Sequence, residues 1–285
     1  MSFKFNFGES STDGTKADVS SEKEEFTQNA LRPCQLHKCD LKKEFVNFEW
    51  SAIDIGKHSL RFVSPDYAAG NVLNDDITSL ITSSDLRSGE YEGGLKVWEC
   101  TFDLLDFMEE NGIGCKANTV FDMGCGAGLL GIFAFLKGSS SVCFQDYNCE
   151  VIESLTIPSL CASLSDAKID PPQDEGRLKL MSGDWGAVGK QLRTENSPPF
   201  DLIISSETIY NVDYYEKILD FLVDNLSKDG EAFFAAKTHY FGVGGGTYDF
   251  VKYVSKSGLF DVSVVKKIEH GLTREILKVF KKKVS

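Results

Sequence analysis

Short apolar runs of β-forming residues alternate with helical stretches through the middle of the chain, and this alternation constrains the fold most strongly. Helices are predicted near residues 129–136, 151–161, 187–192 and 214–226, and strands at residues 120–123, 142–146, 178–182, 202–205 and 232–236. Strands that alternate with helices form βαβ units and a mostly parallel sheet. The sequence therefore predicts an α/β fold.

The C-terminal part breaks this alternation. Two β-rich runs, at residues 260–268 and 275–280, are separated by only a few residues around Gly271. So short a connection requires antiparallel pairing, because a parallel crossover needs a dozen or more residues. We therefore predict a Rossmann-like, seven-stranded, mostly parallel sheet with a C-terminal antiparallel hairpin, the strand plan of class I methyltransferases.

The composition changes along the N-terminal third. Residues 1–30 are polar and acidic with few large apolar side chains, so we expect a disordered tail. Residues 31–89 contain a short candidate strand at 60–63 and are expected to cover the main domain as an extension. The main domain is expected at residues 90–285, and an amphipathic helix near its start runs from Leu95 through Met108 and ends near Gly112.

A glycine-rich turn joins the first predicted strand to its helix, in the sequence V-F-D-M-G-C-G-A-G-L-L-G-I. Gly124, Gly126 and Gly128 allow a tight turn and let a ligand approach the backbone without meeting a Cβ atom. The spacing differs from the G-x-G-x-x-G of dinucleotide-binding turns. The carboxylate of Asp122 suits the cationic ammonium of an amino-acid group. S-adenosylmethionine carries such a group and has no phosphate. An ordinary turn is the alternative.

The next two strands end in polar residues of matching chemistry. Asp146, in F-Q-D-Y-N, can accept hydrogen bonds from both ribose hydroxyls. In S-G-D-W, Asp184 can take the adenine amino group and Trp185 can stack on the ring. Ligands of open α/β sheets bind at these carboxyl ends. Together with the glycine turn, these positions predict S-adenosylmethionine as the cofactor.

Four segments resemble the eukaryotic histidine protein N-methyltransferases: G-L-K-V-W-E-C-T-F-D-L-L, F-Q-D-Y-N, S-S-E-T-I-Y-N and K-T-H-Y-F-G-V-G-G-G. These enzymes modify a histidine of a large-subunit ribosomal protein, and the resemblance extends from Tyr91 to the C-terminus. It implies the same activity and the same methyl donor. The implied cofactor contacts are Trp98, Glu99, Gly124, Gly126, Gly128, Asp146, Tyr147, Asn148, Gly183, Asp184, Trp185, and Ser205 or Ser206.

The acceptor site is expected after the fourth strand. Related lysine and histidine methyltransferases carry D-x-x-Y there, whereas this chain has E-T-I-Y at residues 207–210, a departure that leaves the role of the acid open. We hypothesise that Glu207 offsets the charge that develops on an imidazole, while Tyr210 and His239 shape or hydrogen-bond the ring. A structural role is the alternative for His239. The glycine run at 242–246 lacks the Lys-Ser/Thr of a phosphate loop and is expected to be a pliable loop.

Charge and composition limit the partners. The net charge of −13 disfavours direct nucleic-acid binding and favours a basic protein substrate. No apolar run approaches the ~20 residues of a membrane span, and no signal peptide is evident. We expect no metal site, because Cys34, His37 and Cys39 lack a fourth ligand. We also expect a monomer, and the ribosomal substrate implies cytoplasmic and nuclear localisation.

Three alternatives stay open at this point. A protein-lysine methyltransferase of the same fold differs from the favoured function only in the acceptor. A non-catalytic scaffold could retain the fold to bind a partner, although the complete set of cofactor residues disfavours it. An NAD oxidoreductase is disfavoured by the glycine spacing and by the terminal hairpin.

Overall fold

The computed structural model describes residues 32–71, 90–115, 117–170 and 175–283. The tail predicted at residues 1–30 lies outside the described residues. Within the described residues, no helix combines the length and the apolar character that a bilayer span requires.

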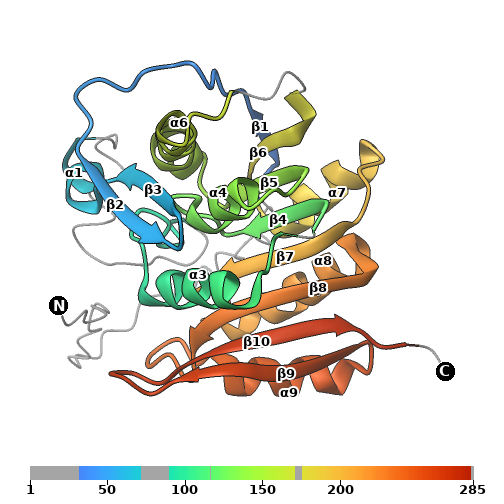
Figure 1. Ribbon diagram of the computed structural model, residues 1–285. Coiled ribbons are helices and arrows are strands. Elements are labelled where there is room, and N and C mark those ends of the chain that lie inside the picture. The colour runs from blue at the N-terminus through green and yellow to red at the C-terminus, as the bar shows by residue number, and fades with distance from the viewer. Residues whose placement is uncertain (1–31, 72–89, 116, 171–174, 284–285) are drawn as a thin grey trace, which may run out of the picture.

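The centre of the molecule is a single mixed sheet with helices on both faces (Figure 1). Its five parallel strands confirm the predicted α/β plan, in the spatial order β6-β5-β4-β7-β8. Their bounds are β4 (Thr119–Met123), β5 (Ser141–Asp146), β6 (Leu178–Ser182), β7 (Phe200–Ser206) and β8 (Leu226–Lys237).

The two edges of this sheet are antiparallel. The predicted hairpin is confirmed: β10 (Arg274–Lys281) pairs with both β8 and β9 (Phe260–Ile268). At the other edge β1 (Gln35–His37) pairs antiparallel with β6, so the sheet has eight strands rather than the predicted seven. This strand is only three residues long and largely exposed, which leaves no hydrophobic alternation to detect.

Alternating side chains of each strand enter one of two cores, as the pleat of a sheet requires. Val120 packs in the core with the helices of one face, whereas its neighbour Phe121 packs in the core with those of the other. The first face carries α3 (Glu99–Asn111), α4 (Leu129–Leu136) and α6 (Ile157–Asp166), and the second carries α7 (Trp185–Thr194), α8 (Tyr215–Asn225) and α9 (Thr247–Ser257). Helix α9 was not predicted.

Short elements complete the chain. The helix α5 (Cys149–Val151) continues into a π-helical turn, η1 (Ile152–Thr156), before α6. The turns η2 (Glu175–Arg177) and η3 (Val212–Tyr214) precede β6 and α8. Helix α1 (Pro65–Asn71) follows the N-terminal hairpin.

The described part of residues 31–89 contributes more than the single strand predicted there. Strands β2 (Trp50–Ile55) and β3 (His58–Val63) form a separate two-stranded sheet beside α4 and α6 (Figure 1). Leu60 and Phe62 are buried against these helices. The helix predicted from Leu95 begins at Glu99 instead, because Leu95 packs in a small cluster with Tyr91 and Val151. Residues 90–98 are therefore an irregular segment, which we call the strap.

Candidate active site

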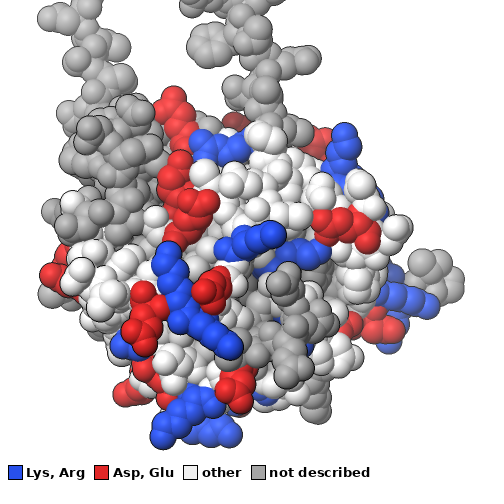
Figure 2. Space-filling view, turned by 90° about the horizontal axis from the view of Figure 1, so that it is seen from above, with Lys and Arg blue, Asp and Glu red and all other residues white. Residues whose placement is uncertain are grey.

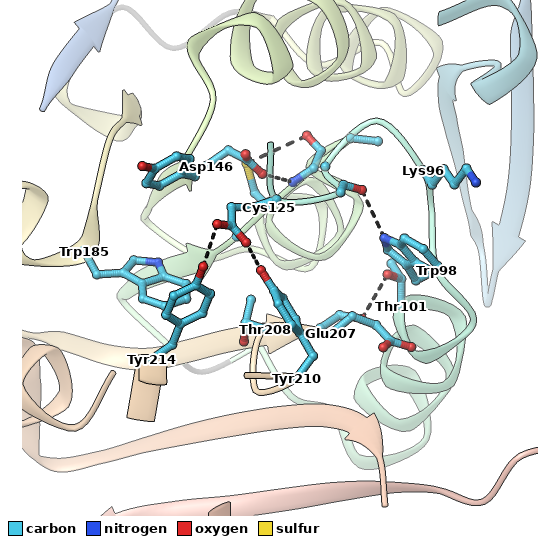
Figure 3. Close-up of a pocket in the computed structure, with 18 of the residues that line it drawn as sticks. Lys96, Trp98, Thr101, Cys125, Asp146, Trp185, Glu207, Thr208, Tyr210 and Tyr214 are labelled. Atoms are coloured by element: carbon cyan, nitrogen blue, oxygen red, sulfur yellow. Dashed lines mark hydrogen bonds between the residues drawn. The ribbon is translucent and has the colours of Figure 1, made fainter. Parts of the chain in front are cut away.

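A cavity of about 770 Å³ opens at the carboxyl ends of the parallel strands. Its volume lies in the ~300–1,000 Å³ range of small-molecule sites. The strap, the glycine turn and the loops after β5, β6 and β7 supply most of its lining. Figure 3 shows Trp98 and Trp185 at opposite ends of the cavity, with Asp146 across from Tyr210 and Tyr214.

The glycine turn approaches the strap closely. Gly126 has a φ of 53°, and a Cβ atom built on it would lie 3.2 Å from the carbonyl oxygen of Gly94. The amide of Gly126 donates to Asp146 Oδ2 at 3.0 Å, and its carbonyl accepts from the Thr156 hydroxyl at 2.7 Å. The peptide is thus held on both sides. Thr156 belongs to the π-helical turn and was not predicted.

Asp146 lies at the end of β5 and lines the cavity, where sequence reasoning placed the ribose. Its Oδ1 accepts from the amide of Asn148 at 3.2 Å, so backbone groups fix both carboxylate oxygens. Burial raises the pKa of Asp146 to about 6, and these backbone hydrogen bonds oppose the rise. Each oxygen retains lone pairs for further donors, as a vicinal diol requires.

Gln145, which sequence reasoning missed, connects three parts of the site. Its Oε1 accepts from the amide of Gly124 at 3.1 Å and from Trp185 Nε1 at 2.8 Å. Its Nε2 donates to the carbonyl oxygen of Gly183 at 2.9 Å. Gln145 is buried beside Asp146 in a strand whose residues from Val142 onward are all buried, so no alternation in the sequence marked this role.

The region predicted for adenine is lined by Asp184 and Trp185. Asp184 caps α7 by accepting from the amide of Gly186 at 2.9 Å, and it forms an ion pair with Lys217 at 2.7 Å. Tyr147 lines the same end. The guanidinium of Arg32 lies 4.7 Å from the Tyr147 ring centroid, so the N-terminal extension contributes to this wall.

The strap lines the cavity beside Asp146. Trp98 Nε1 donates to the carbonyl oxygen of Gly93 at 3.1 Å, and Asn148 Nδ2 donates to that of Glu90 at 3.0 Å. A Cβ atom on Gly94 would lie 3.0 Å from Asp146 Oδ2. The strap also places Glu92 in the lining, where its carboxylate accepts hydrogen bonds from the hydroxyls of Tyr210 and Tyr214. No sequence signal had singled out Glu92.

Several predicted cofactor residues lie behind the lining rather than in it. Asp122 is buried beneath the turn, where its Oδ2 accepts from the amide of Gly131 at 2.8 Å, and its predicted contact with the amino-acid group stays a prediction. Burial raises its pKa to about 7. Ser205 donates to the carbonyl oxygen of Met123 at 2.9 Å, whereas Ser206 lines the cavity. The others that do not line it are Glu99, which pairs with Arg274 at 3.5 Å, and Gly128, Asn148 and Gly183.

The predicted catalytic residues separate in the structure. Tyr210 and Glu207 line the cavity, but His239 does not; it is exposed, with its ring 5.0 Å from that of Phe241. The turn after β8 directs His239 outward and the neighbouring Tyr240 inward, where the Tyr240 hydroxyl donates to the Glu207 carboxylate. The contact of His239 with the acceptor therefore stays a prediction, and the structure places its side chain outside the cavity lining.

Glu207 has an unusual backbone and a buried side chain. Its φ is 60°, a region that non-glycine residues seldom adopt outside functional or tightly constrained sites. The hydroxyl of Tyr240 donates to Glu207 Oε2, the buried Oε1 has no hydrogen-bond partner among the described residues, and Cys100 and Lys237 lie nearby. Burial raises the pKa of Glu207, and the Lys237 charge opposes that rise. In Figure 3 the Glu207 carboxyl group points away from the hydroxyls of Tyr210 and Tyr214.

The glycine run that sequence reasoning treated as a pliable loop is held against the site. The amide of Gly245 donates to the carbonyl oxygen of Tyr210 at 3.0 Å, and Gly244 forms an isolated bridge with Asn211. A Cβ atom on Gly245 would lie 2.3 Å from that carbonyl oxygen. Glycine is therefore required at 245 because the two backbones touch, whereas Gly244 has open space around it and a φ of 85°.

The lining fits S-adenosylmethionine. Asp146 suits the ribose diol, aromatic rings flank the adenine end, and the close approach at Gly126 leaves backbone rather than side chains beside the ligand. Among the described residues no group of three or more His, Cys, Asp or Glu side chains could hold a metal ion. His37 instead hydrogen-bonds Ser182 at 2.8 Å, and the Cys39 and Cys161 thiols lie 3.7 Å apart.

Comparison with known proteins gives the same assignment. Residues 79–242 match a family model described as lysine methyltransferase. A histidine protein methyltransferase 1 homolog of Rattus norvegicus is 39% identical over 217 residues, which cover 70% of this chain and 60% of that protein. Histidine protein methyltransferase 1 of Saccharomyces cerevisiae is 32% identical over 276 residues, covering 78% of this chain and 73% of the yeast protein.

A solved structure shares the fold. A protein from Streptococcus mutans described as a SAM-dependent methyltransferase superposes with a TM-score of 0.54 at 12% identity, over 83% of this chain and 56% of that one. The chain spans about 60% of the length of the first curated relatives that it matches. With the family model and the yeast relative, these matches show that the chain belongs to the methyltransferase family that includes the histidine protein methyltransferases.

Proposed function

We propose that this chain is a protein-histidine N-methyltransferase that uses S-adenosylmethionine to methylate an imidazole nitrogen of a large-subunit ribosomal protein. The observation that carries the proposal is the carboxylate of Asp146, held at 3.0 Å by the amide of Gly126 within a cavity that continues to Tyr210. The names of the curated relatives support histidine as the acceptor.

The cofactor supplies an electrophilic methyl group on a sulfonium ion, and the protein has to align an acceptor with it. The imidazolium form of histidine has a pKa of about 6.5, so near pH 7 most of the side chain is neutral and carries a free lone pair. A site without a strong base can therefore use histidine. The acceptor end of this cavity carries tyrosine hydroxyls and carboxylates, which can bind the second ring nitrogen through its N–H group.

A protein-lysine methyltransferase is the second candidate, because the matching family model bears that description. A lysine amine has an ordinary pKa of about 10.4 and must lose a proton before it can attack. Burial of the amine in a cavity of this kind would lower its pKa. Identification of the methylated residue separates the two candidates.

The substrate proposal rests on charge and on the resemblance. The chain carries 43 acidic and 30 basic residues, and a negative protein attracts a basic partner. On the face seen in Figure 2, acidic and basic side chains are interspersed, without one continuous basic region. A basic ribosomal protein suits such a surface better than nucleic acid does. We also propose that the protein acts as a monomer in the cytoplasm and nucleus, where ribosomal proteins are made and assembled.

Labelled methyl transfer tests this proposal. A lysate of cells that lack the enzyme, containing ribosomal and non-ribosomal proteins, is incubated with the purified chain and S-adenosylmethionine carrying a radioactive methyl group. We expect label in one basic ribosomal protein, and none when Asp146→Asn replaces the wild type. Label only in non-ribosomal proteins would reject the substrate, and binding of S-adenosylmethionine without any transfer would favour a scaffold.

A further inference from the structure

A carboxylate in the cavity, that of Glu92, is held between two tyrosines from a distant part of the chain. The Tyr214 hydroxyl donates to Glu92 Oε1 at 2.7 Å, and the Tyr210 hydroxyl donates to Oε2. The two tyrosine rings meet edge to face, with centroids 5.8 Å apart. Because each hydroxyl hydrogen is directed at Glu92, the phenol oxygens and the carboxylate offer only acceptor positions to a ligand.

The backbone of Glu92 is fixed as firmly as its side chain. Its amide lies 3.4 Å from Asn148 Oδ1, and the carbonyl oxygens of the nearby residues Glu90 and Gly93 accept from Asn148 Nδ2 and from Trp98 Nε1 respectively. Burial and the Glu92 carboxylate raise the pKa of Tyr210 well above its usual value, so its hydroxyl stays protonated and keeps donating. The carboxylate is therefore positioned before any ligand binds, as an orienting group must be.

Three buried carboxylates, those of Asp146, Asp184 and Glu207, also line the cavity, whereas Glu92 is half-buried. Asp146 accepts from backbone amides of the glycine turn and of the loop after β5. Asp184 caps α7 and pairs with Lys217. Glu207, the acid that sequence reasoning favoured, is bonded by Tyr240 and turned away from the hydroxyls of the tyrosine pair. Glu92 is the lining carboxylate that accepts from the hydroxyl of Tyr210, so it lies beside any ring that contacts Tyr210.

We propose that Glu92 orients the acceptor imidazole by accepting the hydrogen bond of its N–H group, and so decides which ring nitrogen is methylated. The inference rests on the proposed histidine methyltransferase activity and adds the residue that sets its regiochemistry. An imidazole has two nitrogens, and the one that carries hydrogen cannot attack. A fixed acceptor on one side leaves the lone pair on the other.

The atoms and electrons of the methyl transfer are accounted for in this arrangement. The lone pair of the free ring nitrogen forms the new N–C bond while the S–C bond of the sulfonium breaks, and the sulfur keeps that electron pair. The ring becomes an N-methylimidazolium whose positive charge lies next to the Glu92 carboxylate. The remaining N–H proton passes to water once the product leaves, so the protein needs no strong base.

The test compares the two N-methylhistidine isomers in acid hydrolysates of a methylated protein substrate, for wild type, Glu92→Gln and Glu92→Asp. The wild type should give one isomer. Glu92→Gln should slow turnover roughly 10- to 100-fold, the value of a hydrogen bond to a charged group, and should give a mixture of isomers. A glutamine amide both donates and accepts, so it no longer selects one tautomer. Glu92→Asp should be slower but keep the single isomer.

Two controls make the result decisive. Glu216→Gln, at an exposed position of α8 outside the cavity, should behave as wild type. Calorimetry with S-adenosylhomocysteine should give Glu92→Gln a Kd within about threefold of wild type, since the hydrogen bond in question is made to the acceptor. A single unchanged isomer from Glu92→Gln would overturn the inference, whether turnover is normal or falls with cofactor affinity. Wild-type methylation of lysine instead would reject the proposed function itself.

Discussion

The two ends of the cavity are held together in different ways. At the cofactor end, backbone amides bind the side chain of Asp146, and all of these groups lie within the strand ends of one βαβ unit. At the proposed acceptor end, side chains bind one another across long sequence distances: Glu92 accepts from Tyr210, and Glu207 accepts from Tyr240. The first arrangement follows from a local motif, whereas the second exists only once the strap and the loops after β7 and β8 have come together.

The largest effect is expected at the cofactor end, from Asp146→Asn. The amide would direct N–H groups at the backbone donors that now bind the carboxylate, and it would lose charge-assisted hydrogen bonds to the ribose, each worth about 1.5–3 kcal/mol. We predict a Kd for S-adenosylhomocysteine raised roughly 100-fold, measured by calorimetry. An unchanged Kd would place the ribose elsewhere and remove the distinction between the two ends.

Lowering the pH should weaken the binding of the cofactor ribose to Asp146. Burial raises the pKa of Asp146 to about 6, so the free protein prefers this carboxyl protonated. The stability that this group contributes is full below the ordinary pKa of about 3.9 and is lost as pH rises through 6. Binding of the ribose needs the ionised carboxylate, so the affinity for the cofactor should rise as pH rises through 6. We predict a Kd about tenfold higher at pH 5 than at pH 7, while a pH-independent Kd would contradict it.

A smaller loss of cofactor affinity is expected from Gly126→Ala, and Gly112→Ala is its matched control. Both glycines have positive φ, 53° and 62°, so both substitutions should cost about 1 kcal/mol of stability. A Cβ atom meets the strap at 3.2 Å only at Gly126, whereas nothing lies within 4 Å at Gly112. We predict about fivefold weaker cofactor binding for Gly126→Ala alone. Equal Kd values for the two variants would show that the strap can move away from the added methyl group without loss of cofactor affinity.

The smallest effect on cofactor affinity is expected at the acceptor end. Tyr240→Phe removes the hydroxyl that donates to buried Glu207, which should cost about 1–3 kcal/mol of stability. Thermal unfolding should show a lower Tm, by a few degrees per kcal/mol. The Kd for S-adenosylhomocysteine should change less than about twofold, because Tyr240 does not line the cavity. A large loss of affinity would mean that the two ends are not separable.

Much of the fold could be predicted because periodicity and turn chemistry record it locally. The five parallel strands and the hairpin around Gly271 follow from apolar runs and from one short connection. Strand β1 could not be predicted, since a three-residue edge strand takes its conformation from its neighbour β6. The start of α3 was placed too early, because Leu95 is apolar for a contact with Tyr91 rather than for a helix.

The candidate site divides in the same way. Asp146 and the glycine turn could be identified because the motif itself supplies their hydrogen-bond partners. Gln145 and Glu92 could not, because their roles depend on groups up to 122 residues away, the distance from Glu92 to Tyr214. His239 and Tyr240 show that position in the sequence alone does not predict which way a side chain points. They are adjacent in sequence, yet the turn after β8 exposes one and buries the other.

One measurement tests the central claim most directly: mass-spectrometric identification of the residue that receives the methyl group from S-adenosylmethionine in a protein substrate treated with this chain. We predict a single added methyl group on an imidazole nitrogen of histidine, absent when Asp146→Asn replaces the wild type. A methyl group on a lysine amine would contradict the account of the acceptor end, even with the cofactor end intact.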